Sequence, residues 1–102
     1  MPLLDEELRN RLPRLRSQEA EVEPFVYARF YLPGTLRAWY VTEGEPRGED
    51  YIFFGFVTVI DQFCEFRLSE LEAIRDLFGS PVERDHTFTA GRLTDVVPAP
   101  DS

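Results

Sequence analysis

The chain has 102 residues, of which 43% are hydrophobic and 29% charged, and its formal net charge is -8. This length and composition indicate one globular domain, and they exclude a disordered chain or a set of several domains. All eleven basic residues are arginines, and the lack of lysine excludes phosphate-loop NTPases and Schiff-base enzymes, which need a lysine amine.

The compartment is predicted from the cysteine content and from the apolar runs. Cys64 is the only cysteine, so no internal disulfide can form and nothing indicates an oxidising environment. The longest stretch without charge, residues 51–60, has about half of the ~20 apolar residues that a membrane-spanning helix needs. The N-terminus lacks the basic and apolar regions of a signal peptide. We therefore expect a cytoplasmic protein that makes no contact with a membrane.

The first predicted element is a short helix over residues 6–12, because Asp5 can cap its start and Pro13 ends it. Residues 16–24 follow without an apolar period and with three glutamates. That pattern is typical of an exposed connector.

The next two segments predict a β-hairpin. Residues 25–32 alternate between two faces, and the face expected in the core holds Val26, Ala28, Phe30 and Leu32. Pro33-Gly34 is a strong turn signal, which joins this strand to a second one over residues 35–43.

Two further strands follow an acidic loop over residues 43–50. The strand at residues 51–60 is apolar on both faces, which predicts a place near the centre of the sheet. Within it, Gly55 indicates a bulge or close packing. A short turn at residues 61–62 leads to a fourth strand over residues 63–68.

The last third of the chain predicts a helix and a strand. Ser69 and Glu72 have the spacing of a capping box, and Gly79 is a typical end for the helix. The apolar face of this helix is expected to hold Leu71, Ile74, Leu77 and Phe78. A final strand over residues 82–88 precedes one helical turn at residues 93–96.

This order of elements predicts an α+β fold with a single antiparallel sheet of about five strands, because the short connections favour a meander over crossover units. Two helices accompany the sheet, one N-terminal and one between the last strands. One domain is expected over residues 1–97, followed by a disordered tail at residues 98–102.

No motif in the chain names a reaction. His86 is the only histidine, and its neighbour Asp85 points to the opposite face of the predicted strand, so the two do not form a local pair. Carboxylates are numerous, and a metal-dependent hydrolase or nuclease stays open if four of them converge, namely Glu43, Asp50, Glu83 and Asp85. The favoured prediction is a protein without catalytic residues, metal or cofactor.

Two groups of residues are candidate binding surfaces for a protein partner. The first mixes aromatic side chains with arginine, as protein interfaces often do, and comprises Tyr27, Arg29, Tyr31, Arg37 and Trp39. It stays exposed if both helices pack on the opposite face of the sheet, and becomes structural if a helix covers it. The second is the acidic loop with Glu43, Glu45, Glu49 and Asp50, although such loops are most often simply solvated.

A basic run lies within this acidic chain, at Arg9, Arg11, Arg14 and Arg16. These arginines suit a phosphate group or an acidic partner, and they equally suit the negative end of the first helix. The net charge argues against direct binding of nucleic acid, so a nucleic-acid-associated module is a second alternative only. A homo-oligomer stays open.

Several blocks of sequence, in a fixed order, resemble one bacterial family. They are LLDEELRNRLP at the N-terminus, WYVTEGE followed by DYIFFGFV at the centre, then FRLSELEAIR and PVERDHTF. Over about residues 3–97 the chain is similar to domain-of-unknown-function family 2958. The resemblance implies a small protein that is often carried on plasmids and other mobile elements, with no established activity or catalytic residue.

Together, these observations favour a small, acidic, non-enzymatic protein-interaction module. Mobile elements often carry small acidic proteins that bind host defence or DNA-processing proteins, and the resemblance suggests such a partner by analogy.

Overall fold

The structure is a computed structural model that describes residues 2–97. Its strands are β1 (Phe25–Val26), β2 (Ala28–Tyr31), β3 (Ala38–Arg47), β4 (Asp50–Val57), β5 (Gln62–Arg67), β6 (Glu83–Arg84) and β7 (Gly91–Arg92). Its helices are α1 (Glu6–Arg11), α2 (Leu68–Ala73) and α3 (Leu93–Val96). The tail expected at residues 98–102 lies outside the described residues.

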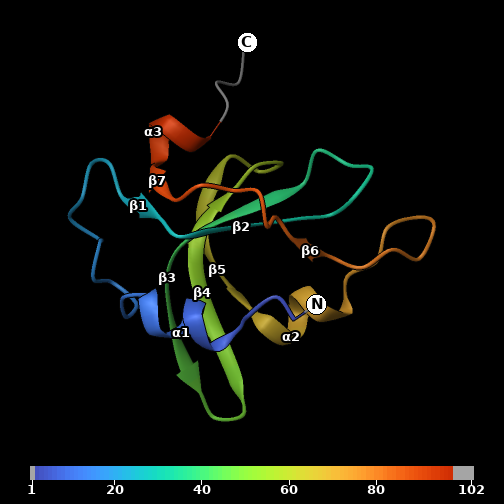
Figure 1. Ribbon diagram of the computed structural model, residues 1–102, viewed down its shortest axis with the longest axis horizontal. Helices are drawn as coiled ribbons and strands as arrows, with labels where there is room; N and C mark the ends of the chain where they lie inside the picture. The colour runs from blue at the N-terminus through green and yellow to red at the C-terminus, as the bar shows by residue number, and fades with distance from the viewer. Residues whose placement is uncertain (1, 98–102) are drawn as a thin grey trace.

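The predicted α+β fold is confirmed. A five-stranded antiparallel sheet has the order β5-β4-β3-β2-β6, and a second, two-stranded sheet pairs β1 with β7 (Figure 1). Strands β2 to β5 form the expected meander, and β6 returns to the free edge of β2. The third predicted strand, β4, is an inner strand, while β3 occupies the middle of the sheet.

One face of the large sheet carries the main core, and both α1 and α2 contribute to it. Leu8 and Leu12 come from α1 and its end, and Leu71 comes from α2. Their partners on the sheet include Phe30, Trp39, Val41, Phe53 and Phe66. Helix α1 forms as predicted, since the Asp5 carboxylate accepts a hydrogen bond from the Leu8 amide at 2.8 Å.

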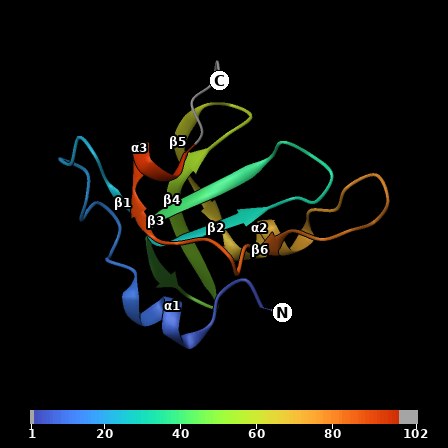
Figure 2. The ribbon, with the colours of Figure 1, turned by 45° about the horizontal axis from the view of Figure 1, so that its top comes forward.

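A smaller cluster covers part of the opposite face. It has three buried members, Val26, Ala38 and Tyr40, against which Leu93 and Val96 of α3 pack. Figure 2 shows α1 and α3 at opposite ends of the molecule, in keeping with their packing into separate clusters. The strand that is apolar on both faces, β4, contributes Phe53 to the first cluster and Phe56 to the second. These two clusters explain why its sequence lacks a polar face.

The alternation predicted for residues 25–32 is interrupted at Tyr27. All four expected core residues are buried, but Val26 belongs to the smaller cluster whereas Ala28 and Phe30 belong to the main core. Tyr27 lies between β1 and β2, and its amide donates to the Val41 carbonyl at 2.9 Å. The backbone therefore changes face at this residue, since β1 leaves the large sheet to pair with β7.

The predicted length of the acidic loop, residues 43–50, is wrong. Strand β3 continues to Arg47 and β4 begins at Asp50, which leaves Gly48 and Glu49 as a two-residue turn. Gly48 has a φ of 61°, as such a turn requires. Cross-strand pairing has extended both strands into a sequence that is locally turn-like.

The second predicted helix is shorter than expected. Helix α2 ends at Ala73, and the Asp76 carboxylate instead closes a turn by accepting the amides of Phe78 and Ser80, each at 2.8 Å. Ser69 is not the N-cap of α2, because the helix begins at Leu68 and its N-cap is Arg67. The Ser69 hydroxyl instead donates a hydrogen bond to the Asp50 carboxylate at 2.6 Å.

The final predicted strand over residues 82–88 is reduced to the two residues of β6. After it the Asp85 amide donates to the Arg29 carbonyl at 2.9 Å, and the Asp85 carboxylate accepts the Thr87 amide, also at 2.9 Å. The first bond continues the pairing with β2 in the same register, and the second closes the turn that ends it. Within residues 2–97, no helix has both the length and the apolar character needed to cross a membrane.

Candidate binding site

A β-bulge in β3 decides which side chains face the candidate site. Val41 lies opposite Gly55 and Glu43 lies opposite Phe54, so Thr42 is the extra residue between them. Strict alternation would have placed Glu43 on the core face with Val41. With the bulge, Glu43 emerges on the face of Phe54 instead.

Gly55 fits the close approach that was predicted for it. A Cβ at this position would collide with the Tyr40 carbonyl and would lie 3.1 Å from the Val41 Cα. Both of these atoms belong to the backbone of β3, so no side-chain rotation relieves the collision. The bulge and the glycine therefore bring β3 and β4 together beneath the site.

The Glu43 side chain fastens the connector to the sheet. Only 2% of Glu43 is exposed, and its two carboxylate oxygens accept the backbone amides of Arg16 at 2.6 Å and Gln18 at 2.7 Å. Nearby, the Glu45 carboxylate accepts the Leu15 amide at 3.1 Å. A carboxylate bonded in this way is a structural anchor rather than a free acidic group.

Gln18 completes the attachment from the connector side. Its amide nitrogen donates to the carbonyls of Phe25 and Thr42, and its amide oxygen accepts the Phe25 backbone N–H at 2.7 Å. The predicted connector is therefore exposed on its outer side, as at Glu19 and Glu21, but is held at its inner side. It forms a wall over the second face of the sheet.

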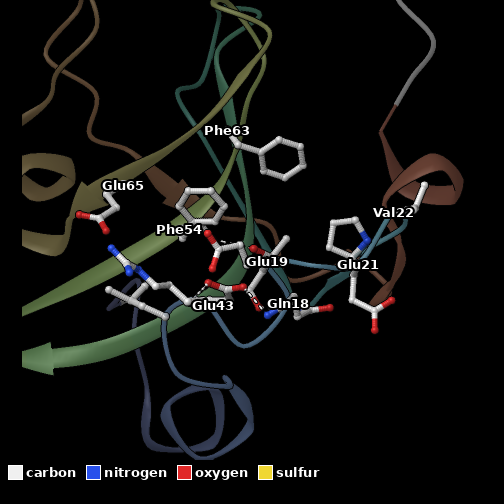
Figure 3. A pocket seen from close by; sticks show the side chains of 12 residues that line it. Gln18, Glu19, Glu21, Val22, Glu43, Phe54, Phe63 and Glu65 are labelled. Atoms are coloured by element: carbon white, nitrogen blue, oxygen red, sulfur yellow. Dashed lines mark hydrogen bonds between the residues drawn. The ribbon is translucent and has the colours of Figure 1, made fainter.

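Between this wall and the sheet lies a pocket of about 400 Å³ (Figure 3). Two aromatic rings from neighbouring strands, Phe54 of β4 and Phe63 of β5, stack against each other at 5.8 Å with an interplanar angle of 13°. We call this space the connector pocket. Its charged lining consists of four glutamates and one arginine, namely Glu19, Glu21, Glu43, Glu65 and Arg16.

The connector pocket is therefore lined mainly by apolar groups, with Leu15, Val22 and Pro24 beside the two rings, and its charged lining is mainly acidic. Figure 3 shows the carboxylates of Glu19, Glu43 and Glu65 near the Phe54 ring. Both oxygens of Glu43 are already bonded to backbone amides. The exposed carboxylates of Glu19 and Glu65 are therefore the ones beside the rings that a ligand could reach. Such a lining suits a cationic or amphipathic group.

The aromatic and arginine residues predicted as one surface are placed on different parts of the molecule. Because Phe30 pairs with Trp39 across β2 and β3, Trp39 lies in the main core and is only 3% exposed. Tyr27 also packs against the main core, while Tyr31 packs against the smaller cluster. Arg37 is exposed, with its guanidinium 5.0 Å from the Trp39 ring. The expected single patch is absent among these residues.

Arg29 has partners within the chain. It forms an ion pair with Asp85 at 3.1 Å, its Nε donates to the Tyr40 hydroxyl at 3.2 Å, and it lies 5.1 Å from the Tyr31 ring. Burial acts to raise the pKa of Asp85, but hydrogen bonds from Thr87 and the charge of Arg29 hold that pKa below its ordinary value. This network joins β2 to the chain after β6.

The acidic residues predicted as a second surface are also separated by their contacts. Glu43 is buried and Glu45 is half-buried, so only Glu49 stands exposed at the tip of the β3–β4 hairpin. Asp50 is bonded to Ser69, and the hydrogen bond from the Ser69 hydroxyl lowers the pKa of Asp50. Asp50 thus connects the start of β4 to α2.

In the part of the chain that the structure describes, no three side chains among histidine, cysteine, aspartate and glutamate are placed to hold a metal ion. Three of the four carboxylates considered for such a site have other partners, since Glu43 binds two amides, Asp50 binds Ser69 and Asp85 binds Arg29. The fourth, Glu83, is exposed on β6. His86 is exposed in the turn after β6.

Of the residues that line the connector pocket, sequence reasoning named as candidates only Arg16, in the basic run, and Glu43, which it placed in an exposed acidic loop. Its aromatic pair had a usable signal, because Phe54 and Phe63 lie on neighbouring predicted strands, at residues 51–60 and 63–68. The contacts of Gln18 and Glu43 with distant backbone had no signal, since Gln18 binds the Thr42 carbonyl 24 positions away and Glu43 binds the amides of Arg16 and Gln18. Contacts over such distances leave no periodic pattern.

The comparisons with known proteins agree with the resemblance drawn from the sequence. A family model described as "Protein of unknown function (DUF2958)" matches residues 3–97. No curated protein and no solved structure matches the chain. The match covers nearly all of the described residues. The chain therefore belongs to this family of proteins of unknown function.

Proposed function

We propose that the chain is a non-enzymatic protein-interaction module that takes a basic side chain of its partner, an arginine, into the connector pocket. The observation that supports this most is the stacked pair of Phe54 and Phe63 beside exposed carboxylates. A guanidinium is attracted to the face of an aromatic ring and forms two parallel hydrogen bonds to a carboxylate. The connector pocket offers both kinds of group to one side chain.

The size and stiffness of the connector pocket support the same proposal. Its volume of about 400 Å³ is near the lower end of the range of ligand pockets, and suits one long side chain with its flanking backbone. Glu43 and Gln18 hold its outer wall in place before any ligand arrives. A preformed wall loses little conformational entropy on binding, which favours affinity.

The charge of the whole chain favours a basic partner. With a net charge of -8, the protein attracts positively charged surfaces over distances of about 8 Å at physiological ionic strength. In the setting that the family resemblance suggests, the partner is a host protein whose basic surface normally contacts DNA. Binding should then weaken as salt is added.

The test is a titration of the isotope-labelled protein followed by two-dimensional NMR. The probes are a short blocked peptide with one central arginine and the same peptide with citrulline, which has the same shape without the charge. We expect the arginine peptide to shift the amide signals of the connector, β4 and β5, and the citrulline peptide to leave them unchanged. An arginine peptide that shifts none of these signals would contradict the proposal.

Two substitutions test the site itself, Phe63→Ala and Glu65→Gln. Each should weaken binding of the arginine peptide about two- to fivefold, because each removes one exposed contact between the guanidinium and an aromatic ring or a carboxylate. The matched control is Glu49→Gln, which removes one exposed charge at the distant hairpin tip and should bind as the wild type does. Equal losses in Glu49→Gln and Glu65→Gln would show a general attraction of charges and not this pocket.

A further inference from the structure

Two large apolar side chains project from the loop between α2 and β6. Leu77 is 99% exposed and Phe78 is 93% exposed. The loop is an ordered turn, because the Asp76 carboxylate accepts the amides of Phe78 and Ser80 and the Gly79 amide donates to the Asp76 carbonyl at 3.1 Å. Figures 1 and 2 show it extending away from the body of the molecule. We call this pair the Leu77–Phe78 knob.

The same chain carries an apolar pocket of about 360 Å³ beside α2, which we call the α2 pocket. Its apolar lining includes Trp39, Val57, Phe66, Leu71 and Ile74. Val59 and Ile60 also line it, although their side chains are 62% and 52% exposed. Arg37, Glu65 and Glu70 line it too, so the apolar surface that it leaves in water is chiefly that of Val59 and Ile60, and exposing such side chains is unfavourable.

We propose that two copies of the chain form a dimer in which the Leu77–Phe78 knob of each copy enters the α2 pocket of the other. The knob is apolar and stands on a hydrogen-bonded turn, and the α2 pocket is mainly apolar and large enough for a phenyl ring. In a single copy the knob is almost fully exposed, so it does not fill the pocket of its own chain. Mutual insertion removes both apolar surfaces from water.

The position of the knob allows such an exchange to be reciprocal. Ile74 lines the α2 pocket and lies three residues before Leu77, so knob and pocket belong to one region of the surface. A twofold dimer requires this arrangement, because the same patch must supply both halves of the contact. Charged groups accompany both halves of the contact: Arg37, Glu65 and Glu70 line the α2 pocket, while Arg75 and Asp76 stand at the base of the knob, so each half carries charges of both signs.

Sedimentation velocity over a series of protein concentrations tests the dimer. We expect the wild type to pass from monomer to dimer as concentration rises, and the double variant Leu77→Asp/Phe78→Asp to stay monomeric. The matched control, Val22→Asp, changes a side chain that is 92% exposed on the connector, and should dimerise as the wild type does. All the changed side chains are exposed, so thermal unfolding of the dilute monomers should be unaltered.

Two outcomes of this experiment would overturn the dimer. One is a wild type that stays monomeric at the highest concentration reached. The other is a double variant that dimerises with the wild-type affinity.

Disulfide trapping tests the contact directly, because Cys64 lines the α2 pocket and is the only cysteine. The double variant Phe78→Cys/Cys64→Ser is mixed with tagged wild type and oxidised. Burial raises the pKa of the Cys64 thiol, so the oxidation is run at alkaline pH. A mixed dimer that carries one tag should form. The control Val22→Cys/Cys64→Ser should give little of it, and equal yields from the two variants would refute the proposal.

Discussion

At the scale of single residues, Glu43 shows how a carboxylate in an acidic stretch is used inside a fold. Its position between Thr42 and Gly44 indicated a solvated loop, yet it is buried and bonded to two backbone amides. Buried backbone N–H groups need an acceptor, and a carboxylate provides two oxygens for the amides that the connector leaves unpaired. Glu43 therefore stabilises the wall of the connector pocket.

Replacing Glu43 should destabilise the protein. Glu43→Ala leaves the amides of Arg16 and Gln18 without their acceptors, and we expect a loss of about 2 kcal/mol in the free energy of unfolding. Glu43→Gln keeps one accepting oxygen and should lose about half as much. Urea unfolding measures both, and faster hydrogen exchange at the two amides would locate the change. Glu49→Ala is the control, and a loss there as large as in Glu43→Ala would contradict this role.

At the scale of elements, the β3–β4 hairpin places the site. The bulge at Thr42 brings Glu43 to the connector side, and Gly55 on the opposite strand allows the two backbones to approach. Bulges are found where a strand must redirect a side chain, and this one also separates the main core from the connector pocket. The two features act together because they face each other across the ladder.

A pair of glycine substitutions tests this element. Gly55→Ala places a methyl group against the Tyr40 carbonyl, so the strands must separate, and we expect a loss of about 3 kcal/mol in the free energy of unfolding. Gly48→Ala at the hairpin tip meets no atom within 4 Å and carries only the strain of its positive φ, about 1 kcal/mol. Thermal or urea unfolding compares them. If Gly55→Ala and Gly48→Ala lost similar amounts of unfolding free energy, the close packing of β3 against β4 at Gly55 would be contradicted.

At the scale of the whole molecule, aspartates connect elements that are distant in the chain. Asp5 caps α1 and forms an ion pair with Arg84 of β6 at 2.9 Å, while Asp50 joins β4 to α2 through Ser69. The pKa of Asp5 is lowered first by the Leu8 amide and also by Arg84, and that of Asp50 first by the Ser69 hydroxyl. Both groups are therefore more easily ionised in the folded chain.

These lowered pKa values predict the response of the protein to acid. A carboxyl group whose pKa is lower in the folded state stabilises the fold above its ordinary pKa of 3.8, and that contribution is lost as the pH falls through the lowered value. We expect the urea concentration at the midpoint of unfolding to decrease when the pH is lowered below about 4. The decrease should be smaller in Asp5→Asn and in Asp50→Asn. Asp61→Asn, in the exposed β4–β5 turn, should follow the wild type. A wild-type midpoint that is constant down to pH 2 would contradict the prediction.

Local signals predicted some elements well and others poorly. Helix α1 formed as expected because its cap, its apolar residues and its terminating proline all lie within a few residues of one another. Helix α2 ended early although its apolar period continues to Phe78, because the turn closed by Asp76 ended the helix first. An apolar period shows which side chains a helix could bury, but competing local hydrogen bonds decide whether the helix continues through them.

The sequence by itself determined the α+β class, the four-strand meander and the family. The class and the meander follow from alternation, turn residues and short connections, all of which act over neighbouring positions, whereas the family follows from the resemblance of whole blocks of sequence. Only the tertiary structure decided the pairing of Phe30 with Trp39, the bulge at Thr42 and the burial of Glu43. Alternation within one strand does not specify its register against the next, and a single extra residue reverses the face of those that follow. The connector pocket depends on both, so it exists only in the folded chain.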